Sequence, residues 1–304
     1  MRLFENPSIQ FVNSRKIAYT ISGILLVVSI FAIIGKGLQY GIDFKGGTEY
    51  VVSFEQQVDV TEVRSALTGP LASAPEVKRF GTGNDILIRA ESSDRDISEL
   101  QNIVMGGLSD LYPDNNAEVI KTNIVGPRFA EDLKTGALQS VIWALVIVFI
   151  YILIRFKNWT YSAGAVAALF HDVLIVLGIF TLFAEYMPFN MQIDQALIAA
   201  FLTIVGYSLN DTVVVFDRIR ENSILFKTME NSKMINKSLN DTLSRTVITS
   251  LTTLFVVLVL FIFGGEVLKG FSFALVIGVI LGTYSSLFVA SSIVVELSEK
   301  GAST

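Results

Sequence analysis

One carboxylate stands out in an otherwise apolar part of the sequence. Asp211 lies in an apolar run that starts near Ile193 and is long enough to cross a bilayer as a helix. A charged side chain is costly in hydrocarbon, and such residues usually take part in the movement of ions or protons. Burial favours the neutral form of a carboxyl group, so Asp211 is a candidate to bind and release a proton.

The neighbours of Asp211 extend it into a polar stripe. Four polar residues fall on one face of the expected helix: Thr203, Tyr207, Asn210 and Asp211. At about 1.5 Å of rise per residue, Asp211 lies about 24 Å from Gln195 and therefore in the inner half of the membrane. The stripe predicts a polar path between helices. The alternative is an acid near the inner interface that is solvated or paired with a cation.

The next apolar run has a polar face that could complement this stripe. Arg245 precedes the run and shares that face with a row of threonines: Thr242, Thr249, Thr252 and Thr253. Because the two runs cross in opposite directions, Arg245 should lie at the depth of Asp211 and Asp217. A pair between Arg245 and Asp211 that forms and breaks would make a switchable site. The alternatives are an Arg245 side chain that extends to the membrane interface, or a static pair with Asp217.

A further apolar run contains the adjacent residues His171 and Asp172, which we place near the middle of the membrane. Neighbouring positions of a helix point about 100° apart, so the two side chains are not expected to share a face. Asp172 at that depth is a second candidate for the proton-carrying network. His171 could instead be a packing residue, and whether either residue lies on the proton path stays open.

The last apolar run repeats small residues every four positions, at Gly278, Gly282, Ser286 and Ala290. A strip of small side chains lets another helix approach closely. We interpret this strip as a helix-packing surface, either within the chain or with a partner.

The composition excludes several kinds of chemistry. Of the 304 residues, 52% are hydrophobic and 17% are charged, which is typical of proteins that cross a membrane several times. There is no cysteine and one histidine, which excludes thiol catalysis and argues against a histidine-based metal site. No ATP-binding motif is present, so we expect an ion gradient or a partner as the energy source, with no enzyme activity and no cofactor. Residues 38–135 carry a net charge of −7 and the rest of the chain +2, and this acidic segment argues against a nucleic-acid partner.

Residues 38–135 lack a long apolar run. Alternating and helical periodicities predict a βαββαβ order there: a strand at 48–54, a helix at 60–68, strands at 77–80 and 86–90, a helix at 96–111 and a strand at 117–124. That order is the ferredoxin-like pattern of an α+β domain. We therefore expect one small domain outside the membrane.

Six apolar runs predict a polytopic protein with six membrane-spanning helices, at 17–34, 137–154, 161–184, 193–216, 246–264 and 271–295. Lys and Arg gather on the flanks that six spans would put on one side, which the positive-inside rule identifies as the cytoplasm. The predicted organisation is a cytoplasmic start with the first helix (1–37), a periplasmic ferredoxin-like domain (38–135), helices two to six with a cytoplasmic linker at 218–244 (136–298), and a cytoplasmic tail (299–304).

Three motifs together resemble the SecD/SecF family of bacterial protein-export membrane proteins, and its SecF members in particular. They are GIDFKGGT at 41–48, IVGPRF at 124–129 and IVGYSLNDTVVVFDRIREN at 204–222. In the first two motifs the residues that carry the resemblance are Gly41, Asp43, Phe44, Gly46, Gly47, Gly126 and Pro127.

This resemblance implies both an architecture and a role. Its members have six spans and one periplasmic domain, resemble half of an RND-type transporter, and reside in the bacterial inner membrane with cytoplasmic termini. The resemblance implies a SecD partner, association with the SecYEG channel and with YajC, and use of the proton motive force to help a translocating polypeptide cross. Asp211 and Arg245 match an aspartate and an arginine that the family uses in proton movement.

Two other functions remain as alternatives. One is a subunit of an RND-type exporter of small molecules or lipids, although complete exporters have two large outer domains and this chain has one small one. The other is a scaffold that binds the translocon and conducts nothing. Replacing Asp211 by Asn would separate the scaffold from a transport protein.

Overall fold

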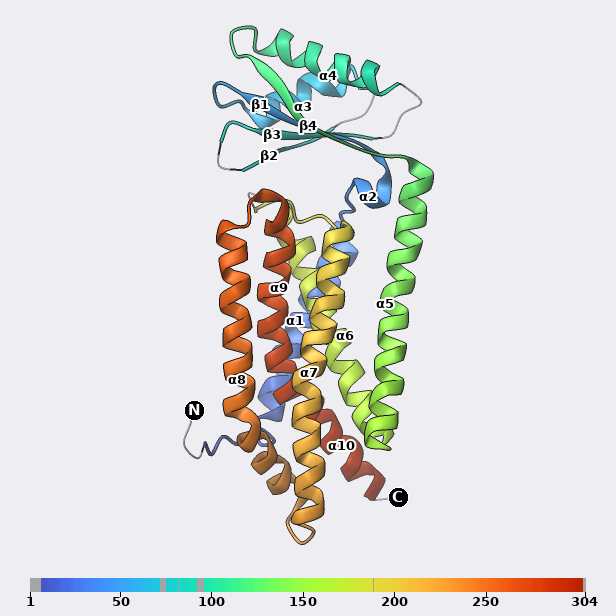
Figure 1. Cartoon of the computed structure of the whole chain (residues 1–304), viewed down its shortest axis with the longest axis vertical. Helices are drawn as coiled ribbons and strands as arrows, with labels where there is room; N and C mark the ends of the chain where they lie inside the picture. Colours follow the sequence, from blue (N-terminus) through green and yellow to red (C-terminus); the bar gives the residue numbers. More distant parts are fainter. Residues whose placement is uncertain (1–6, 72–74, 82, 92–95, 188, 303–304) are drawn as a thin grey trace.

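A bundle of long helices carries a small sheet domain at one end (Figure 1). The computed structural model describes residues 7–302 apart from 72–74, 82, 92–95 and 188. In this part of the chain, six helical runs are long and apolar enough to cross a membrane. They are α1 (Arg15–Lys36), α5 (Pro127–Phe156), α6 (Trp159–Phe183), α7 (Gln195–Leu225), α8 (Asn231–Phe263), and a final run of α9 (Glu266–Ser285), a π-helical turn (Ser286–Ala290) and α10 (Ser291–Ala302).

Local sequence signals start several of these helices. The Asp194 side chain accepts a hydrogen bond from the backbone N–H of Leu197 at 2.8 Å and so caps α7. Asn158 caps α6 in the same way, through the N–H of Thr160 at 3.0 Å. Helix α5 begins at Pro127, where the missing N–H of proline has no intrahelical partner to lose.

The sheet domain, residues 47–125, has the predicted ferredoxin-like order. It comprises β1 (Gly47–Phe54), α3 (Val60–Thr68), β2 (Glu76–Arg79), β3 (Ile86–Ala90), α4 (Ile97–Leu111) and β4 (Ala117–Val125). The antiparallel sheet has the strand order β2-β3-β1-β4, and both helices cover its face away from the bundle (Figure 1). Side chains such as Tyr50, Val63 and Leu108 fill the space between sheet and helices. The predicted strands and helices agree with the observed ones to within one residue at each end.

Several boundaries of the long helices differ from the prediction. Helix α5 already begins at Pro127, inside the segment assigned to the outer domain. Most of the expected linker at 218–244 is helical, because α7 runs to Leu225 and α8 starts at Asn231. These extensions keep an apolar stripe that is buried in the bundle, at Ile219, Met234, Ile235, Leu239 and Leu243, and so they stay helical beyond the apolar runs. A short helix, α2 (Ile42–Lys45), lies in the GIDFKGGT motif, where no helix was expected.

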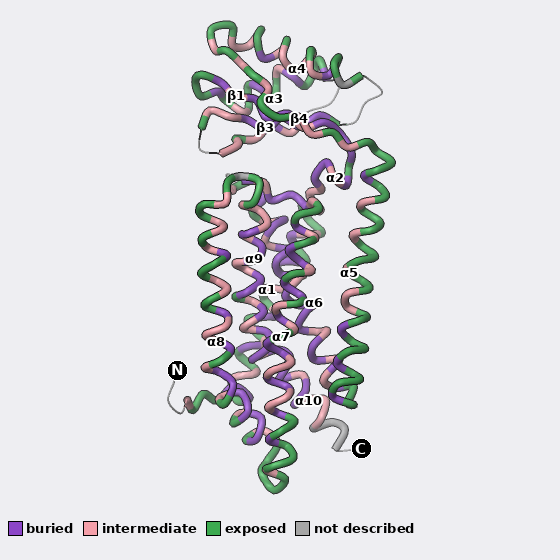
Figure 2. The backbone as a smooth tube through the Cα atoms, in the orientation of Figure 1, coloured by how far each residue is buried: buried purple, intermediate pink, exposed green. Residues whose placement is uncertain are grey.

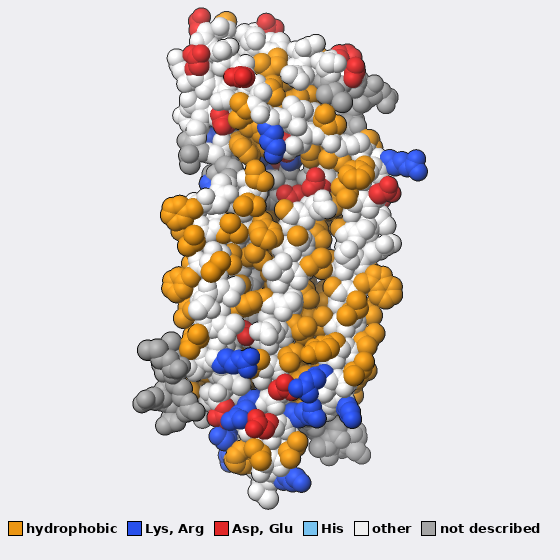
Figure 3. All heavy atoms as spheres, in the orientation of Figure 1, with side chains coloured by type: hydrophobic (Ala, Val, Ile, Leu, Met, Phe, Trp, Pro, Cys, Tyr) orange, Lys and Arg blue, Asp and Glu red, His pale blue; other side chains and the backbone are white. Residues whose placement is uncertain are grey.

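Burial divides the bundle into an inner and an outer set of helices. Much of α6, α7 and α9 is buried, whereas large parts of α5 and α8 are exposed (Figure 2). The exposed side chains of α5 are apolar, as at Trp143, Ile147 and Ile154. Such a surface fits lipid or another membrane protein. Lys and Arg gather at the end of the bundle opposite the sheet domain, where residues 7–14 and α10 also lie (Figures 1 and 3).

Candidate functional site

Asp172 lies at the centre of a buried polar cluster. Its side chain has no exposed area, and its Oδ2 accepts hydrogen bonds from Ser208 Oγ at 2.9 Å and from Ser285 Oγ at 2.7 Å. Nδ1 of His171 lies 2.9 Å from Oδ1. The carboxyl group of α6 is thereby joined to α7 and α9.

The cluster continues from the other side of the His171 ring. Nε2 of His171 lies 3.0 Å from Ser22 Oγ on α1, which lies 3.0 Å from the hydroxyl of Tyr284. That hydroxyl donates to the backbone carbonyl of Ala18 at 2.8 Å. His171 and Asp172 were not expected to share a face, but both are buried and in contact. The two positions point about 100° apart on α6, and both are buried because other helices pack around α6 on several sides.

Asp211 is also buried, with 3% of its surface exposed, but it has far fewer partners. Among the described residues its one hydrogen bond comes from Ser250 Oγ on α8, at a long 3.4 Å. The Ser250 hydroxyl lies closer to the carbonyl of Thr246, at 2.7 Å, and itself accepts from Thr283 Oγ1 at 2.7 Å. A hydroxyl carries one proton, so Ser250 cannot satisfy both acceptors. Asp211 is therefore weakly held, and its hydrogen bonding can change with small movements.

Two further hydroxyls on the same helices lack partners. Tyr207, one turn before Asp211 on α7, and Thr246, one turn before Ser250 on α8, have buried oxygens without a hydrogen-bond partner in the described structure. Buried polar atoms are rarely left unsatisfied unless water or an ion reaches them. The space around Asp211 is therefore polar enough to admit water.

The stripe predicted on α7 is only partly enclosed by this chain. Asp211 is buried and Tyr207 is half-buried, whereas Thr203 and Asn210 are exposed on the surface of the bundle. Polar groups exposed at membrane depth call for another protein surface or water to satisfy them. The stripe thus marks an edge of the bundle rather than a path wholly within it.

Neither of the pairings suggested for Arg245 is present among the described residues. Arg245 is exposed, and no hydrogen bond or ion pair joins it to Asp211. Asp217 instead pairs with Arg155 of α5, with Nη2 and Oδ2 2.9 Å apart. The reason is the relative height of α7 and α8: Ser250 faces Asp211, and Arg245 lies more than one turn nearer the end of the bundle opposite the sheet domain.

Glycines set how closely α9 approaches α7. A Cβ atom at Gly278 would lie 2.3 Å from a side-chain carbon of Ile204, and one at Gly282 would lie 3.0 Å from the Cβ of Ser208. This approach brings Thr283 to Ser250 and Ser285 to Asp172. Ser286 and Ala290 are fully buried in the π-helical turn that follows. In this structure the small residues pack within the chain.

The GIDFKGGT motif joins the sheet domain to the bundle. The N–H of Gly41 donates to the carbonyl of Ile193 at 2.9 Å, and Asp43 accepts from the N–H of Gln195, the first residue of α7, at 3.0 Å. Phe44 is buried against the outer ends of α6 and α7. Gly46 and Gly47 have positive φ angles of 76° and 133°, which turn the chain into β1. Gly126 precedes α5 with an extended backbone.

A second contact between domain and bundle runs through Glu76 of β2. Its carboxylate accepts a hydrogen bond from Gln192, in the loop before α7, and pairs with Arg89 at 2.9 Å. Burial alone would raise the pKa of Glu76, but the positive charges of Lys78 and Arg89 outweigh it and bring the pKa to about 2. Glu76 is therefore ionised across the physiological range and holds the two parts together.

Several residues of this site were not singled out from the sequence. They are small hydroxyl residues and one tyrosine: Ser22, Ser208, Ser250, Thr283, Tyr284 and Ser285. Serine and threonine are common in membrane helices, where they bond to their own backbone, so their presence alone is a weak signal. Among the described residues, no group of three or more His, Cys, Asp or Glu is placed to hold a metal ion.

Comparisons with known proteins agree on one family. Residues 108–300 match the family model for the C-terminal part of the protein export membrane proteins SecD/SecF, and residues 31–58 match the SecD/SecF GG motif. The protein translocase subunit SecF of Rhodothermus marinus is 56% identical over 99% of this chain and 97% of its own length. That of Calditerrivibrio nitroreducens is 41% identical over 97% and 96%.

Solved structures point the same way. A crystal structure of SecDF from Thermus thermophilus, a translocon-associated membrane protein, superposes with a TM-score of 0.85 at 33% identity. The match covers 97% of this chain but 39% of the SecDF chain. The chain therefore belongs to the SecD/SecF family of protein export membrane proteins, within which its full-length relatives are SecF subunits.

Proposed function

We propose that this chain works with a separate SecD subunit and uses the proton motive force to help polypeptides complete their passage across the inner membrane. Asp211 is the proton-carrying group. The observation that carries the proposal is the state of this carboxyl group, which is 3% exposed and has one hydrogen bond, at 3.4 Å. A buried carboxyl group with so little fixed support binds or releases a proton when its surroundings shift slightly.

The surroundings supply a plausible route for that proton. Tyr207 and Thr246, with unsatisfied hydroxyls, lie on the two helices that enclose Asp211, and Thr203 and Asn210 open the stripe to the surface of α7. Arg245 lies toward the inner end, where its positive charge attracts the Asp211 carboxylate that a departing proton leaves behind. The His171–Asp172 cluster is fully hydrogen-bonded and acts as the fixed support against which α7 moves.

The partners and orientation follow from family membership and charge. SecD covers the exposed polar edge of α7, since polar groups at membrane depth need a protein or water partner. The end rich in Lys and Arg is cytoplasmic, which puts the sheet domain in the periplasm, where it meets the emerging polypeptide. SecYEG, with YajC, delivers that polypeptide. The chain has no enzyme activity of its own in this scheme and needs no cofactor.

The decisive experiment compares Asp211→Asn with Glu221→Gln in membrane vesicles that contain the whole translocation machinery. Glu221 is a surface carboxylate on the same helix, paired with Arg218, so its loss controls for the removal of a charge. We expect Asp211→Asn to abolish the part of export that depends on the proton gradient, and Glu221→Gln to retain it.

A protonophore provides the internal check in the same vesicles. It should lower export by the unmodified chain to the level of Asp211→Asn and have no further effect on that variant. Gradient-dependent export that persists in Asp211→Asn would instead favour a scaffold that conducts nothing.

A further inference from the structure

A groove of about 830 Å³ lies at the inner end of the bundle, between α7, α8 and the segment before α1. Four cationic side chains line it, namely Arg218, Lys233, Lys237 and Arg245, together with one acidic side chain, Asp241. The groove therefore carries an excess of positive charge.

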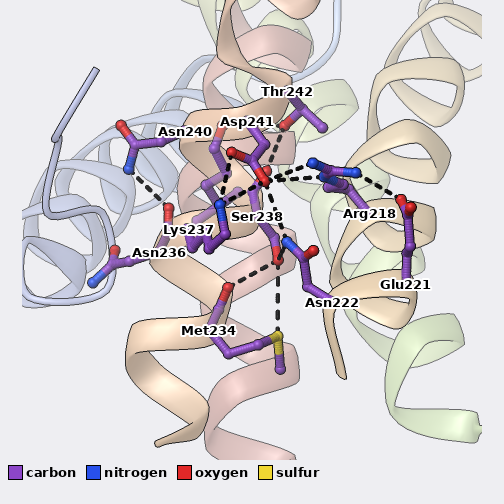
Figure 4. Close-up of polar contacts among 11 residues, drawn as sticks. Arg218, Glu221, Asn222, Met234, Asn236, Lys237, Ser238, Asn240, Asp241 and Thr242 are labelled. Carbon is purple, nitrogen blue, oxygen red and sulfur yellow. Dashed lines mark hydrogen bonds and ion pairs between the residues drawn. The ribbon is translucent and has the colours of Figure 1, made fainter. Parts of the chain in front are cut away.

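The walls of the groove are firmly built. Asn240 on α8 accepts a hydrogen bond from the N–H of Ile9 at 2.9 Å and donates to the carbonyl of Ile9 at 2.8 Å. Asn236, one turn earlier, accepts from the N–H of Val12 at 2.9 Å. These bonds hold the segment before α1 against α8. The groove is thus a fixed feature of the bundle, and polar residues of α8 such as Asn236, Lys237 and Asn240 line it (Figure 4).

The positive charge inside the groove is only partly neutralised. Arg218 takes the short contact with Asp241, at 2.8 Å, and also pairs with Glu221, as Figure 4 shows. Lys237 reaches the same Asp241 carboxylate at a longer 3.4 Å, and Lys233 pairs with Glu230 at 3.1 Å. Arg245 makes no side-chain ion pair within the described structure. An anion in the groove would find Arg245 and Lys237 available.

The face of α8 beyond the groove changes from polar to apolar. Arg245, Ile248 and Thr249 line the groove, and continuing at helical spacing the same face presents Phe255, Val256 and Val259, which are 66%, 70% and 57% exposed. One face of α8 therefore carries Arg245 at the inner end and exposed apolar side chains at membrane depth. A ligand that matches both parts has an anionic head and an apolar tail.

We infer that this groove binds the phosphate headgroup of an anionic phospholipid of the inner leaflet, with an acyl chain along the Phe255–Val259 face of α8. Arginine binds phosphate oxygens through two N–H groups at once, and lysine adds charge. Basic pockets between membrane helices at the cytoplasmic side suit such headgroups. The inference rests on the orientation proposed above and not on proton coupling.

The test measures lipid binding to the purified full-length chain in detergent by native mass spectrometry. The probes are phosphatidylglycerol, phosphatidylcholine with the same acyl chains, and inorganic phosphate. The groove variant is Lys237→Gln/Arg245→Gln, and the matched control is Lys157→Gln/Lys227→Gln. The control removes two exposed lysines from the same end of the bundle but outside the groove.

The unmodified chain should prefer phosphatidylglycerol over phosphatidylcholine. The groove variant should bind phosphatidylglycerol about 30-fold more weakly, since each basic residue near a membrane surface contributes about 1 kcal/mol and about 1.4 kcal/mol is a factor of ten. The control variant should bind it as the unmodified chain does. Phe255→Ser should weaken the binding of phosphatidylglycerol and leave the binding of inorganic phosphate unchanged.

Four results would overturn the inference. Equal affinity of the groove and control variants for phosphatidylglycerol would place the lipid elsewhere. Equal binding of the two lipids would show that the charged head is not recognised. Displacement of phosphatidylglycerol by inorganic phosphate at a comparable concentration would identify a soluble-anion site. If the Phe255→Ser variant bound phosphatidylglycerol as tightly as the unmodified chain does, the acyl chain would not lie on this face of α8.

Discussion

Three carboxylates of this chain are held in three different ways. Asp172 has hydrogen-bond partners on both oxygens, and Glu76 is held by neighbouring cations. Asp211 has a single long contact. The cost of burying a polar group depends on the partners it keeps. In the proposed scheme Asp172 and Glu76 are structural, whereas Asp211 is the carboxyl group whose protonation changes.

Because of Glu76, the sheet domain should become less stable as the pH falls. Its pKa is about 2 in the folded protein against an ordinary 4.5, so the unfolded chain binds a proton first as the pH falls. Its stabilising contribution is complete above pH 4.5 and is lost as the pH falls toward 2. At about 1.4 kcal/mol per pKa unit, the loss amounts to about 3 kcal/mol.

Hydrogen exchange of the β2 and β3 amides, corrected for intrinsic rates, measures this effect. Glu76→Gln should be less stable at neutral pH and should lack the decline between pH 4.5 and 2. Glu55→Gln, on an exposed residue of the same domain, should keep the decline. An unchanged profile in Glu76→Gln would assign the acid sensitivity to other carboxylates.

The functional geometry at the scale of elements depends on how α9 lies against α7. Gly278 and Gly282 let the two helices approach, and this approach supplies Thr283 to the Asp211 site and Ser285 to the Asp172 cluster. Membrane helices associate through close packing, because lipid is as apolar as their side chains. The glycines thus act on the site without carrying any chemistry.

Gly278→Ala should destabilise the bundle by about 1–3 kcal/mol, because its new methyl group would overlap Ile204. Thermal unfolding in detergent measures the change. The double variant Gly278→Ala/Ile204→Ala should recover part of the loss, since the overlapping atoms are removed. Gly206→Ala on α7 is the control: a Cβ there meets nothing within 4 Å. A Gly278→Ala protein as stable as the control would show that the helices can separate at little cost.

The molecule as a whole consists of two parts joined by a small junction. The GIDFKGGT motif binds the start of α7 through Gly41 and Asp43 and then turns directly into β1. Glu76 and Gln192 add a second contact beside it. The start of α7 and the loop before it are therefore hydrogen-bonded directly to the segment that leads into β1. This mechanical link is what proton-driven movement of the outer domain would require.

Gly47→Ala should loosen this link. The φ angle of 133° is strained for any residue with a side chain, and the new Cβ would lie 2.5 Å from the carbonyl oxygen of Ala90. We expect faster limited proteolysis of the sheet domain and a loss of export, with the bundle itself still folded. Gly126→Ala, at the other end of the domain, has room for a methyl group and should behave as the unmodified chain does. Equal protease resistance of the two variants would contradict the junction's role.

The sequence by itself determined the elements and their order. The apolar runs predicted six spans, and alternating and helical periodicities predicted the ferredoxin-like domain, because these patterns are local and depend on the backbone geometry of single helices and strands. The cost of a charge in hydrocarbon also identified Asp211 and Asp172 as buried. The ends of α7 and α8 were missed because their extensions are polar outside and apolar only on the buried stripe.

Only the tertiary structure decided which residues meet. The partner of Asp211 is Ser250 and not Arg245, and His171 and Asp172 join residues of α1, α7 and α9 that lie far apart in the chain. The rotation and height of each helix are set by packing, here by glycines that seat α9 against α7. No local pattern encodes those two quantities. The burial of these carboxylates can therefore be predicted from the sequence, whereas their hydrogen-bond partners depend on how the helices pack.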